Sequence, residues 1–202
     1  MIPFYTFDSK GYQTTFSVIP DLFENAIWND NYGEDRNILD HLLLGEYEHY
    51  SFPIKFHQEA ESGKRFRNII DAGWPLFLIS DKTLGLLTEF NITGWRTYPT
   101  EIKDKKGNSV LGYNGFSITG RGGKFDKKFE MGYLDETKEQ FGAKVRGAYD
   151  LSKWDGSDFF IIKHRWIIVT ERVMKLLKKN KIDAIEYEKL SDYVDYIGES
   201  RF

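Results

Sequence analysis

Two carboxylates stand three residues apart in the string Trp154-Asp-Gly-Ser-Asp158, and such a pair can serve in acid–base chemistry or as metal ligands. A hard cation takes six or more oxygen ligands, however, and Asp155 and Asp158 supply only part of that number. Asp-Gly is also a common turn, in which the Asp side chain accepts hydrogen bonds from nearby backbone. We therefore interpret this string as a structural corner. An enzyme of unrecognised type with an acidic site near Asp155 and Asp158 is the alternative.

The other residue types that carry chemistry form no recognisable pattern. The chain has no cysteine and four histidines, and no two histidines have the spacing of a helical zinc site. The glycine-rich stretch Gly120–Lys124 lacks the Ser or Thr that follows the lysine of a phosphate-binding loop, because Phe125 stands there. We accordingly assign no catalytic residue, no cofactor and no metal, and the enzyme question stays open.

Residues 77–98 and 167–188 are two versions of one unit at a fixed offset of 90 residues. Each begins with a buried apolar run, which predicts a strand, and continues with apolar residues at spacings of three and four, which predict a short helix. Ser80 or Asp81 can cap the free amides of the first helix, and Thr170 those of the second, while an acid suits the positive end of each helix dipole. These structural residues are Ser80, Asp81, Thr170 and Glu171.

Strand patterns outnumber helix patterns in the rest of the chain. Residues 50–57 and 110–119 alternate between apolar and polar residues, and residues 158–163 and 166–170 look like adjacent strands. Residues 4–19 suggest a hairpin-like pair of strands. We predict an α+β fold with a mostly antiparallel or mixed sheet and two quasi-repeated units of strand, capped helix and strand.

Charge is distributed unevenly along the chain. Residues 1–63 hold eleven acids and three bases, a net charge of −8, whereas the whole chain carries −3. This difference suggests an acidic, β-rich N-terminal part over residues 1–63 and a second part over residues 64–202 that carries both units, within one compact protein. An acidic surface attracts basic partners, although acids on a surface also serve solubility alone.

The string Tyr149-Asp-Leu-Ser-Lys-Trp-Asp-Gly-Ser-Asp-Phe-Phe160, followed by Ile168-Val-Thr-Glu-Arg172, resembles a family of uncharacterised bacterial proteins that is grouped with the immunity proteins of polymorphic toxins. The pieces Leu78-Ile-Ser-Asp-Lys82 and Ile92-Thr-Gly-Trp95 resemble the first capped helix of the same family. The similarity covers roughly residues 64–190. Asp81 stands where the family usually has Glu, which leaves the capping role intact.

The resemblance implies a protein that binds a cognate toxin domain, such as a basic nuclease-like one, and blocks it in the cytoplasm of the producing cell. We expect no membrane partner, because the longest apolar stretches are far shorter than the roughly 20 residues that a bilayer requires. Nor do we expect nucleic-acid binding, because the most basic stretch, residues 103–128, has only a weak basic bias. The oligomeric state stays open.

If the chain is an immunity protein, its partner surface should lie where acids and aromatic residues meet, which happens in residues 21–50. The acids would steer a basic partner and the rings would supply contact area. The competing interpretation is that the acids only solubilise the surface and the rings belong to the core. The predicted partner-binding residues are Trp28, Tyr32, Glu34, Asp35, Glu46 and Tyr47.

Overall fold

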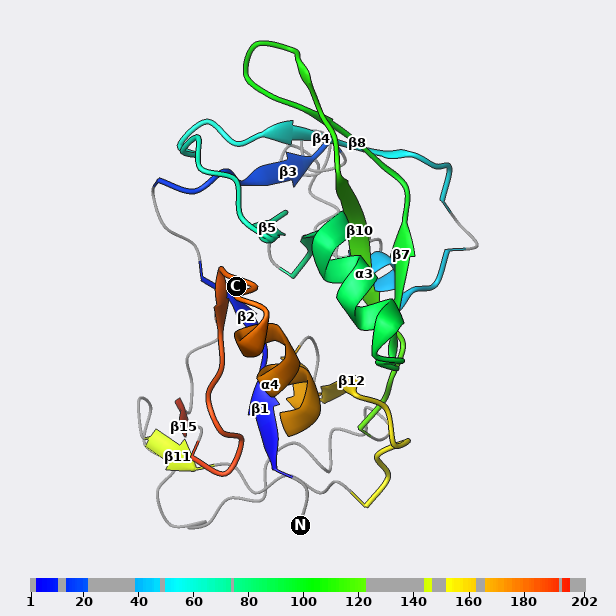
Figure 1. Cartoon of the computed structure of the whole chain (residues 1–202), viewed down its shortest axis with the longest axis vertical. Coiled ribbons are helices and arrows are strands. Elements are labelled where there is room, and N and C mark those ends of the chain that lie inside the picture. Colours follow the sequence, from blue (N-terminus) through cyan, green and yellow to red (C-terminus); the bar gives the residue numbers. More distant parts are fainter. Residues whose placement is uncertain are drawn as a thin grey trace.

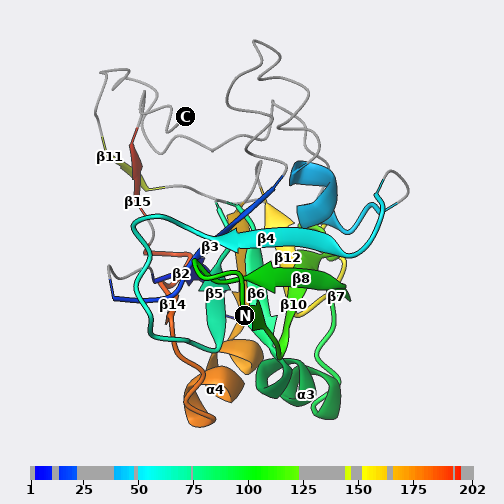
Figure 2. The same cartoon turned by 90° about the horizontal axis from the view of Figure 1, so that it is seen from above.

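The chain has an α+β fold in which two short helices lie on the same side of several small sheets (Figures 1 and 2). The helices are α3 (Asp81–Glu89) and α4 (Glu171–Lys179), and residues 39–44 are also helical. The computed structural model describes residues 3–10, 14–21, 39–47, 50–73, 75–122, 144–146, 152–162, 166–192 and 194–196. Both helices start one residue after the predicted capping residue, so the two predicted helix positions are confirmed.

The first half of the molecule is a four-stranded antiparallel sheet that carries α3. Its strands are β5 (Ile69–Asp71), β6 (Phe77–Ser80), β10 (Tyr113–Ile118) and β7 (Trp95–Tyr98), in that spatial order. The residues from Phe77 to Ile79 are all buried, as expected of a central strand whose two faces are both covered. The helix follows β6 directly and packs back against it.

The second half repeats this arrangement around α4. Its strands are β12 (Phe159–Ile162), β13 (Trp166–Thr170), β1 (Phe4–Thr6), β2 (Asp8–Ser9) and β14 (Ile185–Glu186). Strand β13 lies between β12 and β1, and β2 pairs with β14, all antiparallel. The adjacent strands predicted on either side of residue 164 are therefore confirmed.

The strand registers of the two halves correspond residue by residue. Ile69 pairs with Ile79 in the first half, and Phe159 pairs with Val169, 90 residues further on, in the second. Tyr113 lies opposite Ser80, and Phe4 lies opposite Thr170, so Phe4 takes the place of a residue 109 positions later. The N-terminal strands β1 and β2 thus complete the sheet pairing of the second half, as β10 completes that of the first.

The hairpin predicted for residues 4–19 is therefore wrong. Strand β1 pairs with β13, β2 pairs with β14, and β3 (Val18–Pro20) pairs with β4 (Ile54–Gln58). Residues Ile167–Thr170 of β13 are all buried, so this strand gives Phe4–Thr6 apolar cross-strand neighbours.

A third sheet crosses the top of the molecule in Figure 1. It contains β3, β4, β8 (Thr100–Lys103) and β9 (Ser109–Val110), and β4 and β8 run parallel, so the sheet is mixed. A further pair joins β11 (Lys144–Arg146) to β15 (Val194–Tyr196). Strands from residues 1–63 thus pair with strands from residues 64–202 in more than one sheet.

The two halves share one hydrophobic core. Phe7 and Phe116 stand at corresponding positions, both are buried, and both meet the ring of Phe159 edge to face, at 5.4 and 5.3 Å between ring centroids. Aromatic pairs at this separation and angle contribute beyond simple area burial. The rings therefore fasten the N-terminal strand and β10 to the same point of the core.

Only one of the two predicted capping hydroxyls makes a capping hydrogen bond to its helix. The Ser80 hydroxyl accepts a hydrogen bond from the Thr83 amide at 3.3 Å, whereas the Thr170 side chain makes no such bond. Ser80→Ala should therefore lower the free energy of unfolding by about 1 kcal/mol. Ser80→Thr, which keeps the hydroxyl, is the control. Urea unfolding of both variants measures the difference, and equal stability of Ser80→Ala and the parent would contradict the capping role.

Candidate functional site: a polar network between the two halves

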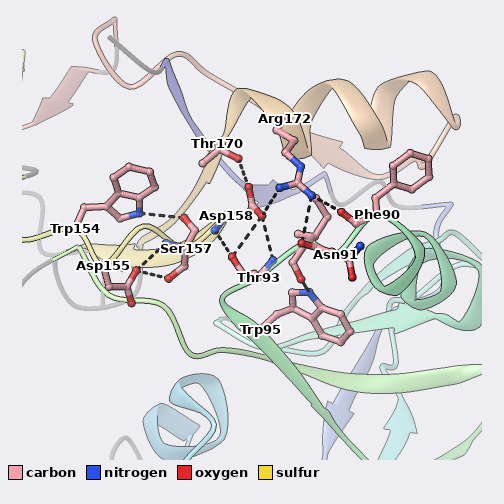
Figure 3. A network of polar contacts seen from close by, with 11 residues as sticks. Phe90, Asn91, Thr93, Trp95, Trp154, Asp155, Ser157, Asp158, Thr170 and Arg172 are labelled. Atoms are coloured by element: carbon pink, nitrogen blue, oxygen red, sulfur yellow. Dashed lines mark hydrogen bonds and ion pairs between the residues drawn. The ribbon is translucent and has the colours of Figure 1, made fainter.

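Asp158 is the centre of a buried polar network just before β12 (Figure 3). Its side chain is held by donors from both halves: the Thr170 hydroxyl at 2.9 Å and the Thr93 amide at 3.1 Å. The Asp158 amide in turn donates to the Thr93 hydroxyl at 3.1 Å. Only 7% of Asp158 is exposed, so each of these bonds replaces one to water.

Thr170 shows why its predicted capping role is wrong. It occupies the N-cap position of α4 with extended backbone, but its hydroxyl donates to Asp158 and does not accept from the helix. The bond that the hydroxyl donates to a buried carboxyl oxygen is stronger than the bond that it would accept from a helix amide, which water can satisfy instead. Only the hydrogen-bond partner of the Thr170 side chain differs from the prediction, because α4 still begins at Glu171.

Arg172 extends the network to the end of the other helix. Its guanidinium forms an ion pair with Asp158 at 3.4 Å and donates to the carbonyl oxygens of Phe90 and, at 3.2 Å, Asn91 (Figure 3). These carbonyls lie at the C-terminus of α3, where a helix lacks internal donors and a cation is favourable. Arg172 therefore joins the start of α4 to the end of α3.

An equivalent contact joins the start of α3 to the end of α4. Lys82, which stands 90 residues before Arg172, donates to the carbonyl of Asn180 at 3.1 Å, and Asn180 stands 90 residues after Phe90. The two halves are therefore related by an approximate two-fold axis, and each helix caps its neighbour. The sequence carried a signal for this pair, because residues 82 and 172 are both basic, but their contact partners could not be read from it.

Asp155 forms the corner that the Asp-Gly pair suggested. One carboxyl oxygen accepts from the amide of Ser157 at 2.9 Å, and the other accepts from the amide of Arg121 at 2.8 Å. Burial alone would raise the pKa of Asp155, but the hydrogen bonds from Ser157 and Arg121 outweigh it and lower the pKa below its usual value. Trp154 is half-buried against Phe4 and Phe160 and donates to the carbonyl of Ser157 at 3.0 Å.

The two carboxylates therefore serve different contacts. Asp158 is directed to Thr170, Thr93 and Arg172 (Figure 3). Asp155 instead accepts hydrogen bonds from Ser157 and Arg121. Within the part of the chain that the structure describes, no three His, Asp or Glu side chains gather as metal ligands would. The arrangement fastens the turn and the two halves, and its carboxyl oxygens are already used by internal donors.

The predicted partner-binding residues are only partly within the described structure. Trp28, Tyr32, Glu34 and Asp35 lie outside the described residues. Glu46 is exposed and pairs with His41 at 2.6 Å. The neighbouring Tyr47 is half-buried: its hydroxyl is 2.8 Å from that of Ser117, and the guanidinium of Arg96 lies 4.0 Å from its ring centroid.

Tyr47 is thus fixed to the scaffold at several points. Burial raises its pKa above the usual value, although Ser117 and Arg96 act in the opposite direction. Its ring also meets Tyr98 edge to face at 5.7 Å. Of the predicted pair, Glu46 is therefore the side chain that the surface presents, and Tyr47 holds the backbone beside it in place.

Comparisons with known proteins add no relative. No protein-family model matches the chain, and a search of curated proteins found no significant match. None of the helices in the described ranges is long and apolar enough to cross a bilayer.

Proposed function

We propose that the chain is an immunity-like protein that binds a bacterial toxin domain and neutralises it by direct contact. The observation that carries this proposal is the use of Asp155 and Asp158, the best catalytic candidates, as internal hydrogen-bond acceptors. A general acid or base needs a carboxyl group that can reach a substrate proton, and these groups are already paired. The resemblance to immunity proteins supports the same class and the cytoplasm as the place of action.

The proposed partner surface is the acidic segment of residues 21–50, and the proposed partner is a basic toxin domain of nuclease-like charge. Glu46 is exposed at the described end of this segment and lies beside the anchored Tyr47. A rigid backbone beside an exposed acid lowers the ordering cost of binding. Opposite charges accelerate association, and salt weakens this effect because it screens exposed charges.

The test uses the toxin domain encoded beside this chain's gene and measures its affinity by titration at low and high salt. Reversing two charges with Glu34→Lys and Asp35→Lys should weaken binding about tenfold and reduce its salt dependence. Glu61→Lys with Glu89→Lys makes the same change in net charge outside the segment, at exposed positions, and is the matched control. If parent and variants bind equally, the acidic surface is wrong. If the chain neither binds nor protects cells from the toxin, the proposed function is wrong.

A further inference from the structure

The two helices differ sharply in charge at equivalent exposed positions. One equivalent pair, Lys82 and Arg172, is basic in both halves; at the other four pairs the second half carries lysine, whereas the first carries small, polar or acidic residues. These lysines are Lys175, Lys178 and Lys179 on α4 and Lys181 just beyond its C-terminus, which together we call the lysine face. Their counterparts 90 residues earlier are Gly85, Thr88, Glu89 and Asn91. These four positions therefore carry +4 in the second half and −1 in the first.

The fold does not require these lysines, and α3 is the internal evidence. Both helices span nine residues and end alike: the amides of Ile92 and Ile182 donate to the carbonyls of Leu87 and Leu177 at 2.9 and 3.0 Å. Lysines near a helix C-terminus are favourable to the helix dipole. However, α3 has no basic residue in its last turn and forms the same helix, so the dipole does not account for the lysine face.

Contacts inside the molecule neutralise little of the lysine face. Lys175 pairs with Glu171 at 2.9 Å, and Lys178 lies 5.2 Å from the ring centroid of Tyr187. Lys179 and Lys181 make no ion pair with any residue in the described ranges. Like charges placed together repel and destabilise, so a cluster that the fold does not need points to an external anionic partner.

We propose that the lysine face of α4 is a docking surface for an acidic protein. This goes beyond the proposed function and does not depend on it, because residues 21–50 carry the opposite charge and suit a basic partner. Lys175, Lys178 and Lys179 stand at spacings of three and four on α4 and match carboxylates spaced in the same way on a partner helix. The surface would contribute mainly speed and orientation of binding.

Nucleic acid and membrane fit this surface less well. A nucleic-acid site usually adds arginines and exposed aromatic rings, and the ring that Lys178 faces, that of Tyr187, is half-buried. The charge of −8 in residues 1–63 would also repel a long phosphate backbone. A helix that binds a membrane inserts apolar side chains, but Val173 and Leu177 are fully buried in the core.

The test transfers the α3 surface to α4 with Lys178→Thr, Lys179→Glu and Lys181→Asn. These residues already stand at the equivalent positions of α3, and Asn91 has the same left-handed backbone as Lys181, with φ of 49° and 54°. The variant should therefore fold. Lys64→Glu with Lys106→Glu removes the same amount of positive charge at exposed positions away from α4 and is the control.

The probe is a fluorescent helical peptide with glutamates at spacings of three and four, titrated against the whole chain. Parallel arms use a single-stranded oligonucleotide and vesicles rich in phosphatidylserine. We expect the parent to bind the peptide in a salt-dependent way, the α4 variant to bind about tenfold more weakly, and the control to stay within about twofold. An equal loss in the control, an unchanged α4 variant, or tighter binding of the oligonucleotide or vesicles would overturn the proposal.

Discussion

Gly94→Ala is expected to destabilise the protein by about 4 kcal/mol, the largest effect of a single methyl group that we predict. Gly94 has a φ of +83°, and a Cβ atom there would lie 2.0 Å from the carbonyl oxygen of Phe159. That oxygen belongs to backbone at the start of β12, which cannot move away without disturbing the junction between the halves. Urea unfolding of the variant measures the loss.

The equivalent position in the second half supplies an internal control. Ala184 stands 90 residues after Gly94 and has a φ of 65°, so an alanine already pays the cost of a left-handed backbone there. Ala184→Gly should therefore leave stability unchanged or raise it by about 0.5 kcal/mol. If Gly94→Ala is as mild as Ala184→Gly, the close approach to Phe159 does not limit this position.

Asp158→Ala should lower the free energy of unfolding by about 3 kcal/mol, because it leaves buried donors without an acceptor. The hydroxyl of Thr170 and the amide of Thr93 both donate to this side chain, and the ion pair with Arg172 would also be lost. The loss should appear in both halves together, since the network joins them. Hydrogen exchange of amides in α3 and α4 would report this joint loosening.

Asp155→Ala is the matched comparison, because Asp155 is exposed and accepts hydrogen bonds from Ser157 and Arg121 but not from Thr93, Thr170 or Arg172. We expect it to cost about 1 kcal/mol, the usual loss when a turn or cap side chain is removed. Equal effects of the two alanine variants would contradict a special role of Asp158. Loss of stability in α4 alone, with α3 protected as before, would contradict the bridging role of the network.

Local features of this protein were predictable from its sequence. The apolar run before each helix, the residue at position 80 and the spacing of Leu87 and Leu177 are short-range signals, and the helices begin where these signals place them. The side chain of Ser80 meets an amide three residues away, so its cap was also readable. The partner of Thr170 was not, because Asp158 lies twelve residues earlier and is brought to it by strand pairing.

The joining of the two halves was decided only by the tertiary structure. Strand β1 corresponds to β10 in register. When residues 3–10 are compared with the residues 109 positions later, only Phe7 is identical to its counterpart, Phe116. Strand pairing is made by backbone groups that every residue carries, and a core needs only apolar side chains of suitable volume. The sequence therefore determined which segments form strands and helices, and long-range packing determined which strand completes each half.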